Sequence, residues 1–288
     1  MAKRMTILVT GATGLQGGTV ARTLLSKEVN VRVLTRFPQK AQDISALGAE
    51  VIRGDFEERD SLQKAIRGAD AVFLMATHIE KGVKAEVANA ESVISVCRRL
   101  GSPHIVYSSV CGANRKTGIP HFESKMRIEK FLKDNIQVYT ILRPVWFMQN
   151  FESQWLLPFI QKGVLSTPIL LNRKLQMIDV SDIGEFASAA ILRAAEFAGQ
   201  EIDLTGDEMT MDDIAWSLSE ALGHEVRYRQ IPEDEAEEAV GSDMSLMYRW
   251  FNTGGPGVDI EGLHKHYGIT LTQFKEYLRR SVAFRKAA

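Results

Sequence analysis

The sequence predicts an α/β fold built around a doubly wound parallel sheet. Three observations support this prediction. Short β-branched segments alternate with helical segments through the first half, the strand segments are almost continuously apolar, and a glycine-rich turn joins the first strand to the first helix. Strands that alternate with helices are typical of βαβ units. Strands that are nearly continuous apolar runs are typical of a sheet that helices cover on both faces.

The first half of the chain contains six strand segments separated by helical segments, whose apolar residues recur three and four positions apart. Strands are expected at 6–10, 31–35, 49–53, 71–76, 104–108 and 138–142. Helices are expected at 15–27, 41–47, 59–67, 84–100 and 123–133. This regular alternation predicts a single parallel sheet.

The pattern changes after Pro144. Two more strands are expected at 177–180 and 201–204, with a helix at 181–195 that Ser181 or Asp182 caps. Further helices are expected at 210–223, 232–249 and 271–285, and a turn-rich break at 252–257. The predicted division is a first domain of residues 1–150, to which 174–204 return. A smaller, mostly helical C-terminal domain then comprises 151–173 and 205–288.

Composition and charge argue against several classes of protein. The 288 residues include 35 Lys or Arg and 36 Asp or Glu, which gives a formal net charge of −1. Nucleic-acid binding through a basic surface is therefore not indicated. Two cysteines, Cys97 and Cys111, exclude a disulfide scaffold. No secretory signal and no apolar stretch of about 20 residues is found, so a cytoplasmic protein without a membrane span is expected.

The glycine-rich turn follows the first strand directly. Gly11, Gly14 and Gly17 are spaced G-x-x-G-x-x-G where the first helix begins. Such glycines permit a tight turn and a close approach to a pyrophosphate, which the free N–H groups of the helix then bind. The alternative is a turn that binds nothing. The residues expected to contact a dinucleotide here are Gly11, Thr13, Gly14, Leu15, Gln16 and Gly17.

The residues after the second strand indicate which dinucleotide binds. A carboxylate there would accept hydrogen bonds from a ribose 2′-hydroxyl and select NAD, but residues 35–40 read TRFPQK. Arg36 can form a forked contact with a 2′-phosphate, and Lys40 adds a second positive charge. The predicted cofactor is therefore NADP(H). The alternative is that Arg36 is a solvated surface residue.

Two further strand ends are expected to border the cofactor. After the third strand, Asp55 is placed to accept a hydrogen bond from the adenine amino group, and Phe56 follows it. The alternative is that Asp55 caps the next helix. After the fourth strand, Ala76 and Thr77 are expected at the carboxyl edge of the sheet, where such folds bind ligands.

These features together resemble the short-chain dehydrogenase/reductase superfamily and, more narrowly, its atypical NmrA-like branch. The similarity covers most of the chain and includes residues 11–17, 31–36, 121–125, 142–144 and 178–183. The resemblance implies a Rossmann-type domain that binds NADP(H). It also implies one of two functions. Some members reduce quinones or related small electrophiles, and others have lost catalysis and act as dinucleotide sensors or transcriptional co-regulators.

The superfamily's catalytic helix carries Tyr-x-x-x-Lys, whose tyrosine supplies a proton and whose lysine binds the ribose hydroxyls. None of the six tyrosines has Lys four residues later, and the matching segment, 121–125, reads HFESK. The resemblance thus implies a cofactor contact by Lys125, whereas His121 stands where the tyrosine is expected. His121 either donates the proton, since histidine titrates near neutrality, or simply starts a helix beside Pro120.

The remaining site residues also come from the resemblance. The superfamily's serine corresponds to Ser108 or Ser109, either of which could bond a substrate carbonyl or simply end a strand. The segment beside the nicotinamide ring corresponds to Pro144 and Phe147. The implied catalytic set is Lys125, His121 and Ser109. No metal site is expected, because the histidine pair at 264 and 266 lacks an obvious third ligand.

The sequence and the resemblance are compatible with two functions. The first is NADPH-dependent reduction of a small quinone-like or conjugated acceptor, because an activated acceptor needs less help from a protein acid. The alternative is a catalytically inactive NADPH/NADP⁺ redox sensor that regulates a partner protein. The expected partner is thus a small-molecule acceptor or a regulated protein. The sequence does not indicate the oligomeric state.

Overall fold

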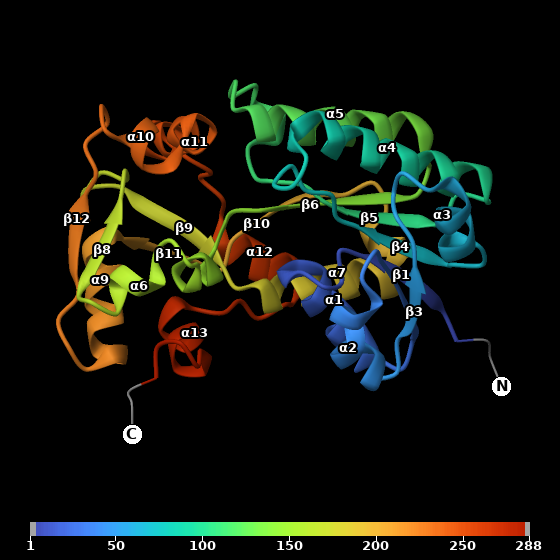
Figure 1. Cartoon of the computed structure of the whole chain (residues 1–288), viewed down its shortest axis with the longest axis horizontal. Coiled ribbons are helices and arrows are strands. Elements are labelled where there is room, and N and C mark those ends of the chain that lie inside the picture. The colour runs from blue at the N-terminus through green and yellow to red at the C-terminus, as the bar shows by residue number, and fades with distance from the viewer. Residues whose placement is uncertain (1–3, 286–288) are drawn as a thin grey trace. The chain divides into compact units, whose positions relative to one another are not determined.

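The computed structural model describes residues 4–285 and divides the chain into two compact units (Figure 1). The first unit comprises Met1–Arg143 and Ile183–Asp203, and the second comprises Pro144–Asp182 and Leu204–Ala288. The first unit therefore ends before the boundary predicted at residue 150, and residues 174–182 fall in the second unit. Within residues 4–285, no helix combines the length and apolarity that crossing a bilayer requires.

A seven-stranded sheet forms the centre of the first unit, in the order β10-β6-β5-β4-β1-β2-β3. Its strands are β1 (Thr6–Thr10), β2 (Asn30–Thr35), β3 (Glu50–Arg53), β4 (Ala71–Leu74), β5 (His104–Ser108), β6 (Tyr139–Pro144) and β10 (Glu201–Leu204). Neighbours from β6 to β3 pair in parallel. The strand order reverses direction between β1 and β4, which is where open α/β sheets bind ligands.

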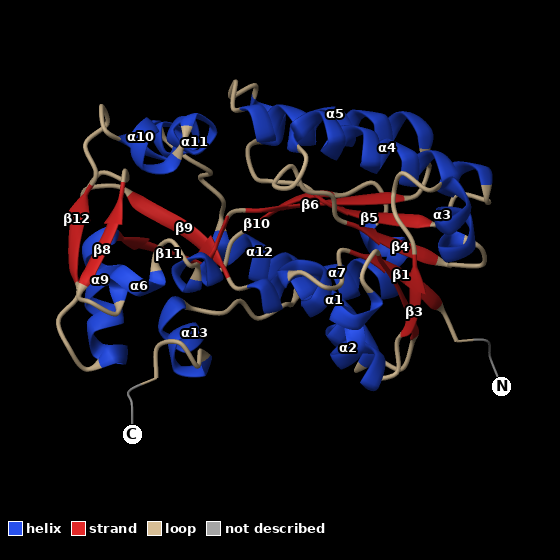
Figure 2. Ribbon diagram, in the orientation of Figure 1, coloured by secondary structure: helices blue, strands red, loops and turns tan. Residues whose placement is uncertain are grey.

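Helices cover both faces of this sheet (Figures 1 and 2). One face carries α1 (Leu15–Leu25), α2 (Gln42–Ala46) and α7 (Val180–Leu192), and the other carries α3 (Arg59–Ile66), α4 (Gly82–Arg99) and α5 (Pro120–Asn135). Every residue of β4 and β5 is buried, as the apolar segments predicted. The doubly wound α/β fold is therefore confirmed. A short helix, α8 (Ala194–Phe197), precedes β10.

Thr10 joins the two central strands at the point where the strand order reverses. Its hydroxyl lies 3.2 Å from the Phe73 carbonyl oxygen and 3.1 Å from that of Met75. The backbone N–H of Met75 donates to the same hydroxyl at 2.8 Å. These contacts are shielded from water because Thr10 is fully buried. They fix the carboxyl ends of β1 and β4 next to each other.

The start of α1 packs directly on the turn that precedes it. Gly11 has φ of +66°, a conformation that glycine adopts without steric cost. A Cβ atom at Gly17 would lie 2.4 Å from the Gly11 carbonyl oxygen, which is closer than atoms can approach. The first turn of α1 can therefore pack this closely against the Gly11 carbonyl only with glycine at position 17.

The second unit contains more strand than the sequence predicted. One sheet has the order β11-β9-β7, from β7 (Trp146–Phe147), β9 (Lys174–Ile178) and β11 (Asp207–Thr210), and β8 (Val164–Thr167) pairs in parallel with β12 (Arg227–Gln230). Its helices are α6 (Leu157–Ile160), α9 (Met211–Leu222), α10 (Ala236–Val240), α11 (Ser242–Thr253), α12 (Ile260–Tyr267) and α13 (Phe274–Arg280). The helix predicted at 232–249 is two helices, because Gly241 adopts φ of +81° between them.

Two carboxylates of the segment 178–183 hold the C-terminal part of the second unit. Asp182 accepts hydrogen bonds from the backbone N–H and the hydroxyl of Thr272, both at 2.8 Å. Arg280 donates to Asp179 at 2.9 Å. Asp179 also accepts from the N–H of Ser181 at 2.8 Å. The predicted cap at Ser181 or Asp182 is therefore wrong: Asp179 occupies the start of α7, and Asp182 binds Thr272.

We expect Gly17→Ala to lower the free energy of unfolding by about 2 kcal/mol or more, because the added methyl group must displace α1 or the turn. Gly14→Ala is the matched control, since its Cβ would lie 3.3 Å from the same Gly11 oxygen. It should cost less than about 1 kcal/mol. Urea denaturation of both variants measures the difference. Equal stabilities would contradict the packing described for position 17.

Burial raises the pKa of Asp182 to about 6. The folded chain therefore binds this proton more tightly than the unfolded chain, so protonation stabilises the fold as the pH falls through 6. Between roughly pH 7.5 and 5, the wild type should gain about 1 kcal/mol relative to Asp182→Asn, which cannot titrate. Denaturation at several pH values measures this difference. A difference that stays constant, or that shifts in favour of the variant at low pH, would contradict the raised pKa of Asp182.

Candidate functional site

A pocket of about 230 Å³ lies along the carboxyl edge of the sheet, entirely within the first unit. The ends of β1, β2, β3 and β4, the loop before α4 and Asn89 of α4 supply its walls. Eight residues predicted to contact a cofactor line it: Gly11, Thr13, Gly14, Arg36, Asp55, Phe56, Ala76 and Thr77. Seven other predicted residues are not among those that line it: Leu15, Gln16, Gly17, Lys40, Lys125, Pro144 and Phe147.

The glycine turn brings the start of α1 to the pocket. Gly14 lines the pocket and is the residue immediately before α1. Among the described residues, no side chain caps this end of the helix. The Gln16 side chain accepts a hydrogen bond from the Ser108 hydroxyl at 2.6 Å, which connects the turn to the end of β5. The first N–H groups of α1 thus remain available to an anion, and the helix dipole favours one.

Arg36 lies at the end of β2 and is part of the pocket wall. Its Nη2 atom donates to Glu80 Oε2 at 2.5 Å, and its Nε atom lies 4.0 Å from Asp55. The hydrogen bond with Glu80 raises the pKa of Arg36. The Arg36 guanidinium and the Lys40 ammonium lie 5.4 and 5.2 Å from the centre of the Phe37 ring. The two cations predicted to recognise a 2′-phosphate therefore contact the same aromatic ring.

Asp55 does not cap the helix that follows it. The residue before α3 is Glu58. One carboxylate oxygen of Asp55 accepts from the N–H of Glu57 at 3.1 Å, and the other oxygen is the one near Arg36. Asp55 also borders the pocket. The capping alternative is therefore wrong, whereas the adenine contact stays a prediction.

Lys125 is held in a buried polar cluster beside the pocket. Its ammonium lies 2.9 Å from Glu86 Oε1 and donates to the carbonyl oxygen of Ala76, a pocket residue, at 2.8 Å. The other Glu86 oxygen accepts from the Ser124 hydroxyl at 2.5 Å. Only 11% of the Lys125 side chain is exposed. Lys125 is thus a fixed cation and not a solvated lysine on a helix surface.

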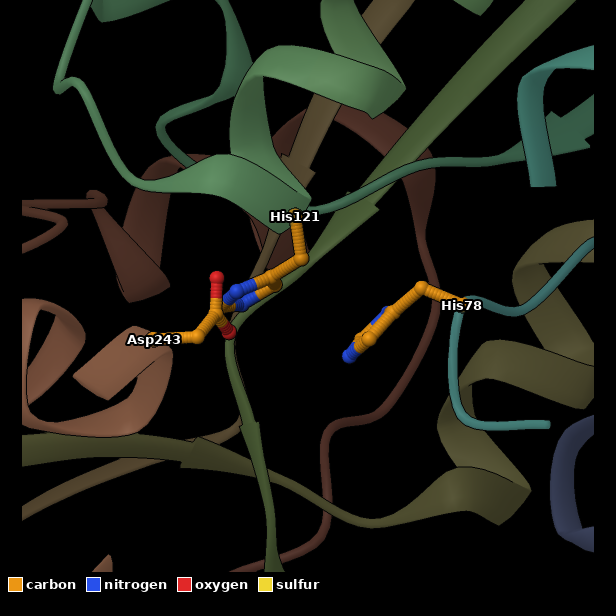
Figure 3. Close-up of side chains that lie close together, drawn as sticks. All are labelled: His78, His121 and Asp243. Atoms are coloured by element: carbon orange, nitrogen blue, oxygen red, sulfur yellow. The ribbon is translucent and has the colours of Figure 1, made fainter. Parts of the chain in front are cut away.

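His121 lies one turn before Lys125 on α5 and stacks against His78, which follows β4 (Figure 3). The two ring centres are 5.1 Å apart and the ring planes are inclined by 26°. His121 is 8% exposed, so most of its surface is removed from water. Asp243, also labelled in Figure 3, belongs to the second unit. Residues four apart on a helix share a face, which places His121 and Lys125 on the same side of α5.

Ser109 belongs to a different network. Its hydroxyl donates to Glu129 at 2.6 Å, and Glu129 accepts two hydrogen bonds from Arg143 at 2.8 and 2.6 Å. All three side chains are buried. Because the Ser109 proton is already bound to a carboxylate, the geometry gives no support to the catalytic role predicted for this residue.

Pro144 and Phe147 lie in the second unit, at the end of β6 and in β7. Their predicted contact with the nicotinamide segment of a cofactor stays a prediction.

Sequence reasoning missed two acidic residues of the site, Glu80 and Glu86. Glu80 is in the loop before α4, and its partner Arg36 is 44 residues away, so no local pattern relates them. Glu86 did leave a signal. It shares a face of α4 with Ala90, Val93 and Cys97, which are buried. An acidic residue on an apolar helix face predicts a buried partner.

The chain is similar in sequence and structure to proteins of known family. The NmrA-like family model matches residues 3–278. An NAD(P)H azoreductase of Xenophilus azovorans is 29% identical over 242 residues, covering 81% of this chain and 80% of that protein. A solved NADPH-dependent quinone oxidoreductase of Escherichia coli is 25% identical with a TM-score of 0.78, and the match covers 96% of this chain and 98% of that one.

A second solved structure is that of NmrA, a negative transcriptional regulator in complex with NADP. It has a TM-score of 0.78 and 17% identity, covering 96% of this chain and 95% of that one. This likeness concerns the fold alone. The family model, in contrast, spans the glycine turn, the end of β2 and α5, which carry the residues described above. The chain therefore belongs to the NmrA-like family.

Proposed function

We propose that this protein is an NADPH-dependent oxidoreductase that reduces a small quinone-like or conjugated acceptor. The observation that carries the proposal is the meeting of the glycine turn and Arg36 in the wall of one pocket. A turn that suits a pyrophosphate and a guanidinium that suits a 2′-phosphate are the two features that NADP(H) requires. The similarity to an azoreductase and a quinone oxidoreductase supports the same chemistry.

The residues present fit NADP(H). The start of α1 has no side-chain cap among the described residues, and Gly17 keeps the helix close to the turn. These features would hold the pyrophosphate. Arg36 and Lys40 would hold the 2′-phosphate, Asp55 would accept from the adenine amino group, and Lys125 would contact the ribose next to the nicotinamide.

NADPH supplies a hydride when it is bound, so the protein has to provide position and electrostatics. Lys125 is fixed by Glu86 and by the Ala76 carbonyl, so its charge is in place before any ligand arrives. A preorganised cation favours the negative charge that develops on an acceptor oxygen. His121, on the same side of α5, is the group that would supply the proton.

A redox sensor is the second candidate, and a specific observation favours it. His121 stands where the superfamily's catalytic tyrosine is expected, and Ser109 is engaged with Glu129. A sensor must bind NADPH and NADP⁺ with different affinities or in different conformations. Equal affinities for the two forms, together with identical protection from proteolysis, would exclude this candidate.

We expect Arg36→Ala to weaken NADPH binding by about tenfold or more, because a charge-assisted contact to the 2′-phosphate is lost. NADH binding should change by less than about threefold. Arg53→Ala, at the end of the neighbouring strand β3 and outside the pocket lining, is the matched control and should leave both affinities unchanged. Fluorescence titration measures the affinities of the wild type and both variants for NADPH and NADH. An equal loss for NADPH and NADH would contradict the role of Arg36.

We expect purified protein to oxidise NADPH with small quinones or enones, and Lys125→Met to lower kcat by about tenfold or more. Lys130→Met is the control, because Lys130 lies on the same helix but is exposed. The rate of NADPH oxidation with each acceptor of a panel measures turnover. Full activity in Lys125→Met would contradict the role of Lys125. Absence of turnover with every acceptor, while NADPH still binds, would favour the sensor.

A further inference from the structure

Glu80 places a carboxylate directly on the cation that is expected to recognise the 2′-phosphate. The Glu80 and Arg36 side chains are joined by a 2.5 Å contact and both border the pocket. Glu80 is 57% exposed and Arg36 is 38% exposed, so water reaches both groups. An ion pair with this exposure contributes little to stability. The pair is thus weak enough for another anion to replace Glu80.

Three carboxylates lie near Arg36, together with the cations of Lys40 and Lys81. Asp55 lies 4.0 Å from the Nε atom of Arg36, and Glu57, which pairs with Lys81 at 2.5 Å, is close by. Lys40 also lies near the Phe37 ring but, within residues 4–285, it has no carboxylate partner. A phosphate that approaches Arg36 therefore meets a guanidinium that already donates to Glu80.

A 2′-phosphate and Glu80 compete for the same guanidinium. A phosphate monoester carries between one and two negative charges at neutral pH, and its oxygens accept the forked N–H groups of arginine. A carboxylate that stays on the same nitrogen would repel it, because like charges a few ångströms apart raise each other's energy. NAD(H), which has no 2′-phosphate, would leave the Arg36–Glu80 pair undisturbed.

We propose that Glu80 is a specificity-determining residue, which occupies Arg36 in the absence of cofactor and has to be displaced by the 2′-phosphate. This inference rests on the proposed binding of NADP(H). Its consequence is that Glu80 reduces the preference of the chain for the 2′-phosphorylated dinucleotide. Cofactor selection is thus set by a residue of the β4–α4 loop as well as by the end of β2.

The test uses 2′,5′-ADP and 5′-AMP, which differ only in the 2′-phosphate. We expect Glu80→Gln to raise the affinity for 2′,5′-ADP by about fivefold relative to 5′-AMP in calorimetric titrations. Glu57→Gln is the matched control, because it removes the same charge from an equally exposed carboxylate that pairs with Lys81 instead of Arg36. Its effect on the affinity ratio should stay below about twofold.

Two double variants distinguish displacement of Glu80 from Arg36 from a general change of charge near the pocket. In an Arg36→Ala background, Glu80→Gln should change the affinity ratio no more than Glu57→Gln does. Equal effects of the two glutamates in the wild-type background would overturn the inference while leaving NADP(H) binding intact. Failure of the wild type and Glu80→Gln to bind 2′,5′-ADP or NADPH would overturn the proposed function itself, and this inference with it.

Discussion

The close packing of α1 against the end of β1 is the constraint on which the site depends. Gly17 leaves no room for a side chain above the Gly11 carbonyl, so the helix begins at the carboxyl edge of the sheet. Thr10 joins that edge to β4, which brings Ala76 and Thr77 to the same pocket. Most of the other pocket residues lie at or just beyond the ends of strands that this core aligns, and the rest come from the β4–α4 loop and from α4.

One ion pair lines the pocket and a second lies beside it, and the two differ in how far water reaches them. Lys125 and Glu86 are shielded from water, so removing either partner leaves an uncompensated charge, and the pair acts as a rigid support. Arg36 and Glu80 are solvated, so their pair can exchange for another anion at little cost. The same edge of the sheet thus combines a fixed cation next to Ala76 with an exchangeable one at the end of β2.

The first unit was largely predictable because its signals are local. Buried strands such as Thr6–Thr10 and His104–Ser108 have apolar centres, and the glycine turn has a fixed spacing. The second unit was less predictable, because strands such as Arg227–Gln230 are short and polar and form through pairing with distant segments. In the site, Arg36 and Asp55 were predictable from their places after strands. Glu80 was not, because only the folded chain brings it to Arg36.

The proposed function requires that this pocket binds NADP(H) and distinguishes it from NAD(H). Calorimetric titration of the wild-type protein with NADPH and with NADH tests that claim most directly. We expect one NADPH bound per chain and an affinity for NADH that is weaker by about tenfold or more. Equal affinities for the two dinucleotides, or no binding of NADPH, would contradict it.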